Sequence, residues 1–162
     1  MLWSVFEGLG LGALLFVYCL IGIKDGAVGM VFLYDKKVVD RCVELGLTSY
    51  EKVKKRAIIF KISGIVLYMA YVLVFAYAVN GARGFLQGFL QMFIMLSVCN
   101  VIDRIFVDEL WVCHTKTWII PGTEDLMPYI KTKDKVKKWI FGTVGMGITA
   151  AALAGIMALI IK

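Results

Sequence analysis

The sequence has few of the residues that common enzyme motifs require. It contains one histidine, two prolines and four cysteines, and no two cysteines form a Cys-x-x-Cys pair. The glycine-rich nucleotide loops, the Gly-x-Ser-x-Gly elbow and the His-Glu-x-x-His zinc motif are also absent from it. A single histidine excludes a multi-histidine metal site. We therefore expect no metal, no cofactor and no disulfide, and we find no motif for nucleotide hydrolysis, dinucleotide redox chemistry or serine or zinc hydrolysis.

Charged residues are also scarce, at 19% of 162 residues, whereas hydrophobic residues make up 60% and the mean hydropathy is +0.82. Soluble domains usually have about 45 to 50% apolar residues. Crossing a bilayer takes roughly 20 apolar residues in a helix, and four windows are long enough, namely 2–23, 57–79, 85–107 and 139–161. The sequence predicts an all-α integral membrane protein, one polytopic domain over 1–162 with four transmembrane helices in two antiparallel hairpins.

Basic residues gather in the two long connections between these windows. Eight lie between residues 24 and 56 and six between residues 108 and 138, whereas the opposite side has only Arg83 and Lys162. Lys and Arg beside membrane helices are retained on the cytoplasmic side. We therefore predict a multi-pass protein of the cell membrane, with cytoplasmic loops at about 24–56 and 108–138 and both termini outside the cytoplasm. The same charges favour anionic lipid head groups as partners, and not nucleic acid.

Each predicted loop contains a segment suited to the membrane interface. In the first loop, Val38 and Cys42 belong to a set of apolar residues at helical spacing, which predicts a short amphipathic helix. In the second, Trp111 and Trp118, followed by Trp139, suit the head-group region, where an indole has one wet and one apolar side. We expect the second loop to lie along the inner face of the bilayer.

Small residues recur at four-residue spacing in the first and last windows. Gly8 and Gly12 form a Gly-x-x-x-Gly motif, which lets two membrane helices approach closely. A longer ridge in the last window consists of Thr143, Gly147, Ala151 and Gly155. These ridges predict close packing within the bundle, or contact with a second copy or another membrane protein.

The polar residues that are suited to binding or catalysis are concentrated at the end of the third window. On ideal helical geometry, six of them fall within an arc of roughly 140°: Asn100, Asp103, Arg104, Asp108, Trp111 and His114. Ionisable groups in membrane helices are costly and often functional. The alternative is structural, because such groups at a membrane boundary also cross-link helices or meet water. Both interpretations stay open at this point.

We assign candidate roles to these residues by their chemistry. A histidine has an unperturbed pKa of about 6.5, so His114 suits a general acid or base, with Asp103 or Asp108 to orient it. The candidate ligand-binding residues are polar or aromatic and lie in the same span, namely Asn100, Arg104, Glu109, Trp111, Lys116 and Glu124. A loop with His, Lys and several carboxylates at the interface suits a ligand with a polar head and an apolar tail.

Three classes of function remain. We favour a small membrane protein that binds or modifies a lipid-like or membrane-partitioned molecule, with its site at the cytoplasmic end of the third helix. The alternative is a non-catalytic subunit or interaction partner of a larger complex, which the missing motifs favour. A transporter or channel comes third, because the charged residues lie toward helix ends and the two hairpins do not resemble each other.

Overall fold

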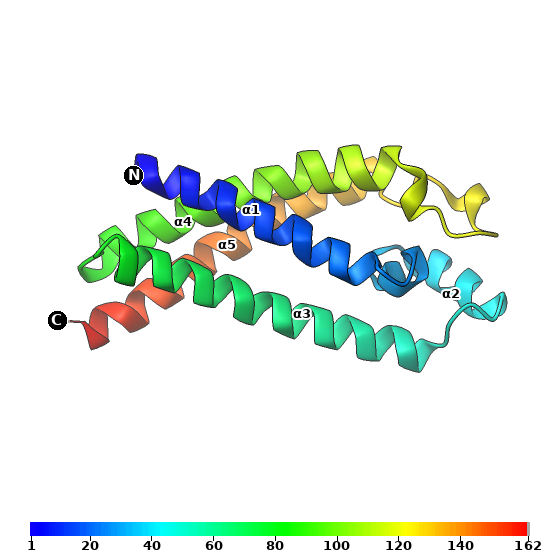
Figure 1. The fold of residues 1–162 in the computed structure, drawn as a ribbon, viewed down its shortest axis with the longest axis horizontal. Helices are drawn as coiled ribbons and strands as arrows, with labels where there is room; N and C mark the ends of the chain where they lie inside the picture. Colours follow the sequence, from blue (N-terminus) through cyan, green and yellow to red (C-terminus); the bar gives the residue numbers. More distant parts are fainter. Residues whose placement is uncertain (162) are drawn as a thin grey trace.

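The structure, a computed structural model, describes residues 1–161, and long helices dominate it (Figure 1). The long helices are α1 (Leu2–Ile23), α3 (Tyr50–Leu73) with its π-helical continuation η2 (Val74–Val79), α4 (Gly84–Ile102) with its π-helical continuation η3 (Asp103–Val112), and α5 (Thr132–Ile160). The short elements are η1 (Ala27–Leu33), α2 (Lys36–Glu44), η4 (Lys116–Trp118) and η5 (Glu124–Leu126). No strand occurs among residues 1–161, which confirms the predicted all-α class.

Within the described residues, four helices are long and apolar enough to cross a membrane: Leu2–Ile23, Tyr50–Val79, Gly84–Val112 and Thr132–Ile160. Large apolar side chains cover their outer surfaces. For example, Leu159 is 81% exposed and Phe141 is 74% exposed. Such a surface is costly in water and favourable in lipid. The fold therefore fits a multi-pass membrane protein.

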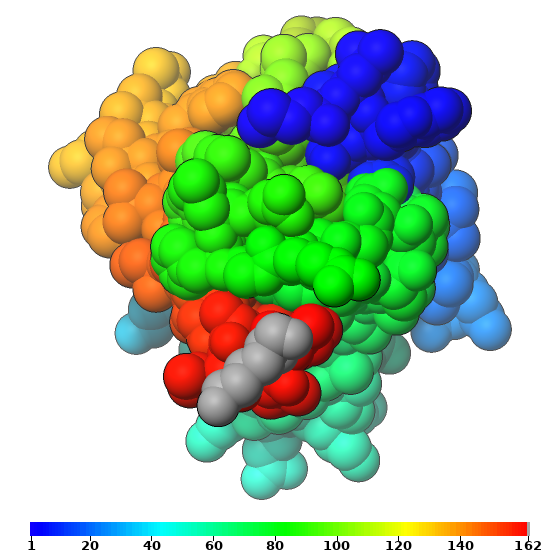
Figure 2. Space-filling view, turned by 90° about the vertical axis from the view of Figure 1, so that its left-hand side faces the viewer, coloured from blue at the N-terminus to red at the C-terminus, as the bar shows by residue number. Residues whose placement is uncertain are grey.

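The long helices are joined so that the two termini lie at one end of the molecule and the two long connections at the other (Figure 1). We call these the terminal end and the loop end. Figure 2 looks onto the terminal end, where the start of α1, the α3–α4 connection and the end of α5 lie together. The α3–α4 connection turns sharply at Gly81 and Gly84, whose φ angles of 61° and 70° favour glycine.

Helix α4 is the centre of the packing, because both α1 and α5 lie along it. The sequence permits this contact at two glycines of α1. A Cβ atom on Gly8 would lie 2.7 Å from Val98 Cβ, and one on Gly12 would collide with Ile102. The prediction that these glycines allow close helix approach is confirmed. Helix α3 makes few contacts with α5, and the two diverge toward the loop end in Figure 1.

The two long connections pack against each other at the loop end. Arg41 of α2 forms an ion pair with Asp125, at 3.3 Å, and the rings of Tyr34 and Tyr129 are 4.6 Å apart. The predicted helix around Val38 and Cys42 is confirmed as α2, with both side chains buried. The loops thus form a second apolar core, distinct from the core between α1, α3, α4 and α5.

Candidate functional site

A cavity of about 520 Å³ lies among α1, α3, α4 with η3, and α5. Its volume is within the range of small-molecule sites, about 300 to 1,000 Å³. Most of its wall is apolar, and the wall residues come from both cores, for example Leu15, Met69, Leu96 and Met146. The cavity lies where α3 and α5 make few contacts, so diverging helices leave space that the side chains do not fill.

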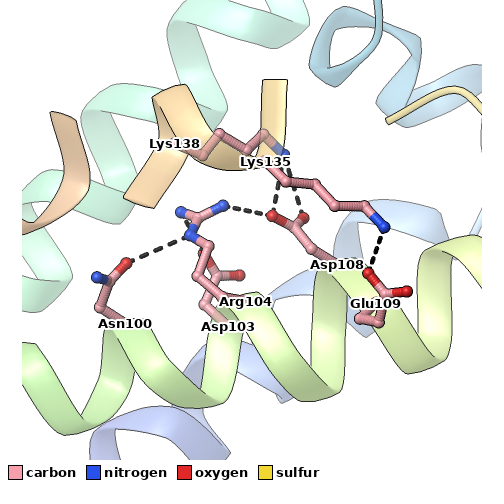
Figure 3. Close-up of polar contacts among 7 residues, drawn as sticks. All are labelled: Asn100, Asp103, Arg104, Asp108, Glu109, Lys135 and Lys138. Carbon is pink, nitrogen blue, oxygen red and sulfur yellow. Dashed lines mark hydrogen bonds and ion pairs between the residues drawn. The ribbon is translucent and has the colours of Figure 1, made fainter. Parts of the chain in front are cut away.

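One edge of this cavity is polar, and it consists of Asn100, Asp103, Arg104, Asp108 and Lys138. We call this set the charged edge. Figure 3 shows that Arg104 lies in the middle of it, among side chains of the same helix, and that Lys138 reaches it from α5. The charged edge therefore joins two elements that are distant in the sequence.

The guanidinium of Arg104 makes three polar contacts in the charged edge. Its Nε donates to Asn100 Oδ1 at 3.3 Å, its Nη2 pairs with Asp103 Oδ2 at 2.7 Å, and its Nη1 donates to Asp108. Lys138 Nζ also donates to both carboxylate oxygens of Asp108, at 3.2 and 3.0 Å. The two cations and two carboxylates balance, so the charged edge has no net charge.

The charged edge is largely shielded from solvent. The side chains of Arg104 and Asp108 are 15% and 13% exposed, and those of Asp103 and Lys138 are 23% and 33% exposed. Buried charges of this kind are tolerated only when they are paired and hydrogen-bonded. The pairing explains how this cluster can lie inside an apolar bundle. It also means that a bound polar group must replace an existing partner.

The structure brings four of the predicted site residues together at the cavity: Asn100, Asp103, Arg104 and Asp108. Three others do not line it. His114 is exposed and its Nδ1 lies 2.7 Å from the carbonyl oxygen of Glu109, while Lys116 and Glu124 are exposed in the second loop. Glu124 accepts a hydrogen bond from the backbone N–H of Gly122, which is a local turn contact.

The π-helical turns of η3 explain the separation of His114 from the charged edge. A π-helix bonds residue i to residue i+5, so each turn holds more residues than the 3.6 of an α-helix. Ten residues, Asp103–Val112, are wound this way. The side chains therefore drift away from the arc that ideal α-helical spacing predicts, and His114 leaves the stripe that begins at Asn100.

The two remaining predicted residues lie beside the cavity and do not line it. Glu109 pairs with Lys135 of α5 (Figure 3). Trp111 packs between Phe16, with ring centroids 4.7 Å apart, and Trp118, at 4.9 Å. Glu109 thus links η3 to α5, and Trp111 supports the cavity wall from behind.

Among the cavity residues that sequence reasoning missed are two with polar groups, Lys138 and Trp118. Lys138 is one of the basic residues that the sequence assigns to the second loop, and only the packing of α5 on α4 brings it to Asp108. Trp118, which we expected to have one wet side, is 0% exposed and lines the cavity. Its indole N–H has no acceptor within residues 1–161. A buried donor without a partner is a site where a ligand oxygen is favourable.

The cysteines outside the long helices are poor nucleophiles in this environment. Burial raises the pKa of the Cys42 thiol and of the Cys113 thiol above the ordinary value. The reactive thiolate is therefore a small fraction of each at neutral pH. This agrees with the absence of a Cys-x-x-Cys motif from the sequence.

The sequence matches no protein-family model, no curated protein and no solved structure. The function has to be inferred from the cavity, its charged edge and the composition of the surrounding helices.

Proposed function

We propose that this chain is a membrane protein that binds a lipid-like or membrane-partitioned small molecule in the cavity among its long helices. The observation that carries the proposal is the combination of an apolar wall and a compact charged edge in one hollow of about 520 Å³. Apolar walls with a few convergent polar groups are typical of small-molecule sites. A ligand with an apolar tail and a polar head has the matching distribution of polarity.

The ligand would enter sideways, from the bilayer, between α3 and α5. Ile65 of α3 and Phe141 of α5 both line the cavity, yet they are 57% and 74% exposed on the outer surface. In a bilayer, outward apolar side chains at this depth contact acyl chains. A molecule dissolved in the lipid would therefore reach the cavity without crossing water.

The polar head would bind by exchange within the charged edge. Arg104 and Lys138 share Asp108, so an anionic group that takes Lys138 as its partner would leave Asp108 still paired with Arg104. The N–H of Trp118 would donate to an oxygen of the ligand. If the bound molecule is chemically changed, Asp103 and Asp108 are the acid–base groups at hand, because His114 lies outside the cavity lining.

We further propose that the loop end faces the cytoplasm, so that both termini lie outside it. The proposal is supported by fourteen Lys and Arg residues in the segments 24–56 and 108–138, eight in the first and six in the second. In the cell membrane, this orientation would place the basic residues of α2 and the start of α3 against anionic lipid head groups.

A cavity-filling substitution tests the proposal. Gly145 lines the cavity, and a Cβ atom there meets nothing within 4 Å, so Gly145→Leu would fill the space without displacing protein atoms near the backbone. Gly155 of the same helix also has open space around it and does not line the cavity. Gly155→Leu is therefore the matched control.

The measurement is native mass spectrometry of the gently solubilised wild-type protein and both variants. We expect a co-purifying small amphiphile on the wild type and on Gly155→Leu, and a loss of at least tenfold in its occupancy on Gly145→Leu. Equal occupancy on all three proteins would contradict binding in the cavity. A stoichiometric protein partner without any small ligand would favour the accessory-subunit alternative.

A further inference from the structure

A second hollow, of about 310 Å³, lies at the loop end. Its wall combines polar and apolar groups about equally, whereas the cavity wall is mostly apolar. It includes two lysines, Lys137 and Lys138, two aspartates, Asp35 and Asp134, and the buried Tyr34. We call it the polar pocket. The first loop, the end of the second loop at Tyr129 and Ile130, and the beginning of α5 form it together.

The polar pocket and the cavity share two wall residues, Leu33 and Lys138. These side chains are the partition between them. Leu33 is 40% exposed and the Lys138 side chain is 33% exposed, so neither is fixed by dense packing on all sides. The ion pair with Asp108, at 3.0 Å, holds the Lys138 side chain in place. A ligand that replaces this pair would connect the two hollows.

Tyr34 lines the polar pocket, and its hydroxyl is a hydrogen-bonding group that no residue within 1–161 uses. Its side chain is 9% exposed, and its hydroxyl has no hydrogen-bond partner within residues 1–161. Burial raises the pKa of this hydroxyl above its ordinary value, so it remains a neutral donor at physiological pH. A buried donor without a partner destabilises the protein. An oxygen atom of a ligand would remove that penalty.

The charges of the polar pocket select the kind of head group. Asp35, Asp134 and Lys137 make no ion pair with any residue between 1 and 161, and Lys138 is paired only with Asp108. A purely anionic head would approach the two lysines but also two unpaired carboxylates, which repel it. A neutral head would leave Asp35, Asp134 and Lys137 without an ion-pair partner. A head that carries one anionic and one cationic group matches both signs.

We propose that the polar pocket binds the zwitterionic head group, phosphate with ammonium, of an amphiphile whose tail occupies the cavity. The phosphate would accept from Tyr34, Lys137 and Lys138, and the ammonium would lie between Asp35 and Asp134. This inference rests on the proposed function, since it assigns the head group of the same ligand. It makes Lys138 the residue that contacts the ligand from both hollows.

The test compares three lipids with identical acyl chains on the full-length protein in detergent: a phosphatidylethanolamine, a phosphatidylglycerol and a diacylglycerol. The variant is Tyr34→Phe, which removes one hydroxyl and keeps the ring that packs on Tyr129. The control is Tyr50→Phe, because Tyr50 is 55% exposed, bonds Asp40 and does not line the polar pocket. Binding is titrated by native mass spectrometry, and thermal unfolding checks that each variant is folded.

We expect the wild type and Tyr50→Phe to bind phosphatidylethanolamine about tenfold tighter than the other two lipids. Tyr34→Phe should lower the affinity for phosphatidylethanolamine about tenfold and leave the affinity for diacylglycerol unchanged. Lys137→Gln should also weaken the binding of phosphatidylethanolamine. Lys137 is exposed, so this substitution does not put folding at risk.

Each contrary result has a distinct meaning. Equal binding of all three lipids, with no effect of Tyr34→Phe, would overturn the head-group inference and leave the cavity proposal standing. Tighter binding of phosphatidylglycerol would overturn the zwitterionic assignment. Failure of every lipid to bind, diacylglycerol included, would overturn the proposed function itself.

Discussion

Replacing Arg104 with methionine should destabilise the bundle far more than the same change at Lys135. Arg104 has a side chain that is 15% exposed and pairs with Asp103 at 2.7 Å and with Asp108. In Arg104→Met, Asp108 keeps Lys138, but Asp103 loses the cation beside it. Removing one partner of a buried pair costs about 3 kcal/mol, because the other charge is left uncompensated.

The assay is denaturant unfolding of the detergent-solubilised protein, followed by helical circular dichroism. Lys135→Met is the matched control, since its pair with Glu109 is more exposed, at 31% and 41% for the two side chains, and exposed pairs contribute little. Adding Asp103→Asn to Arg104→Met should restore part of the lost stability, because it removes the unpaired carboxylate. Equal unfolding of the two single variants, or no recovery in the double variant, would refute the reasoning.

Two further predictions follow from glycine packing and thiol burial. Gly8→Ala should destabilise the protein by about 1 to 3 kcal/mol through overpacking against Val98. Gly155→Ala should be neutral or slightly stabilising, because a Cβ atom there meets nothing within 4 Å. Thermal unfolding of both variants distinguishes these outcomes, and equal losses of stability would contradict the packing of α1 on α4. Burial holds the pKa of the Cys113 thiol above its ordinary value of 9.0, so the rate of its alkylation should still rise above pH 9. Peptide mass spectrometry measures this rate, and a plateau below pH 9 would argue against a buried thiol.

The sequence was sufficient for the helical architecture because hydrophobic length determines it directly. The four apolar windows correspond to the four long helices, and the pattern around Val38 and Cys42 corresponds to α2. Helix α3 begins at Tyr50, ahead of the apolar window 57–79, because Ser49 caps it and accepts a hydrogen bond from the backbone N–H of Lys52. Local signals of this kind depend only on residues that are close in the sequence, so they predict helices without knowledge of the tertiary structure.

The candidate site was predictable only in part, because two of its determinants are not local. The stripe that starts at Asn100 holds for one turn beyond Asp103, and then the π-helical winding of η3 moves His114 away. Nothing in ideal periodicity signals that change of pitch. Lys138 belongs to the charged edge because α5 packs on α4, and the sequence does not say which helices are neighbours.

Buried polar atoms were the other feature that sequence could not reveal. Tyr34 and Trp118 belong to loops that a hydropathy pattern assigns to the membrane interface, yet both side chains are buried by contacts between the two loops and the bundle. Such burial depends on tertiary packing. The orphaned hydroxyl and indole N–H are therefore findings of the structure, and the head-group inference depends on the hydroxyl.

Photo-labelling with an amphiphile that carries a diazirine in its acyl chain tests the central proposal most directly. Peptide mapping of the labelled wild type should find adducts at the cavity wall, at Met69, Leu96 and Met146, and Gly145→Leu should abolish them while Gly155→Leu should not. Labels confined to outward residues such as Ile148, which is 65% exposed, with no effect of Gly145→Leu, would show that lipids only surround this protein and do not enter it.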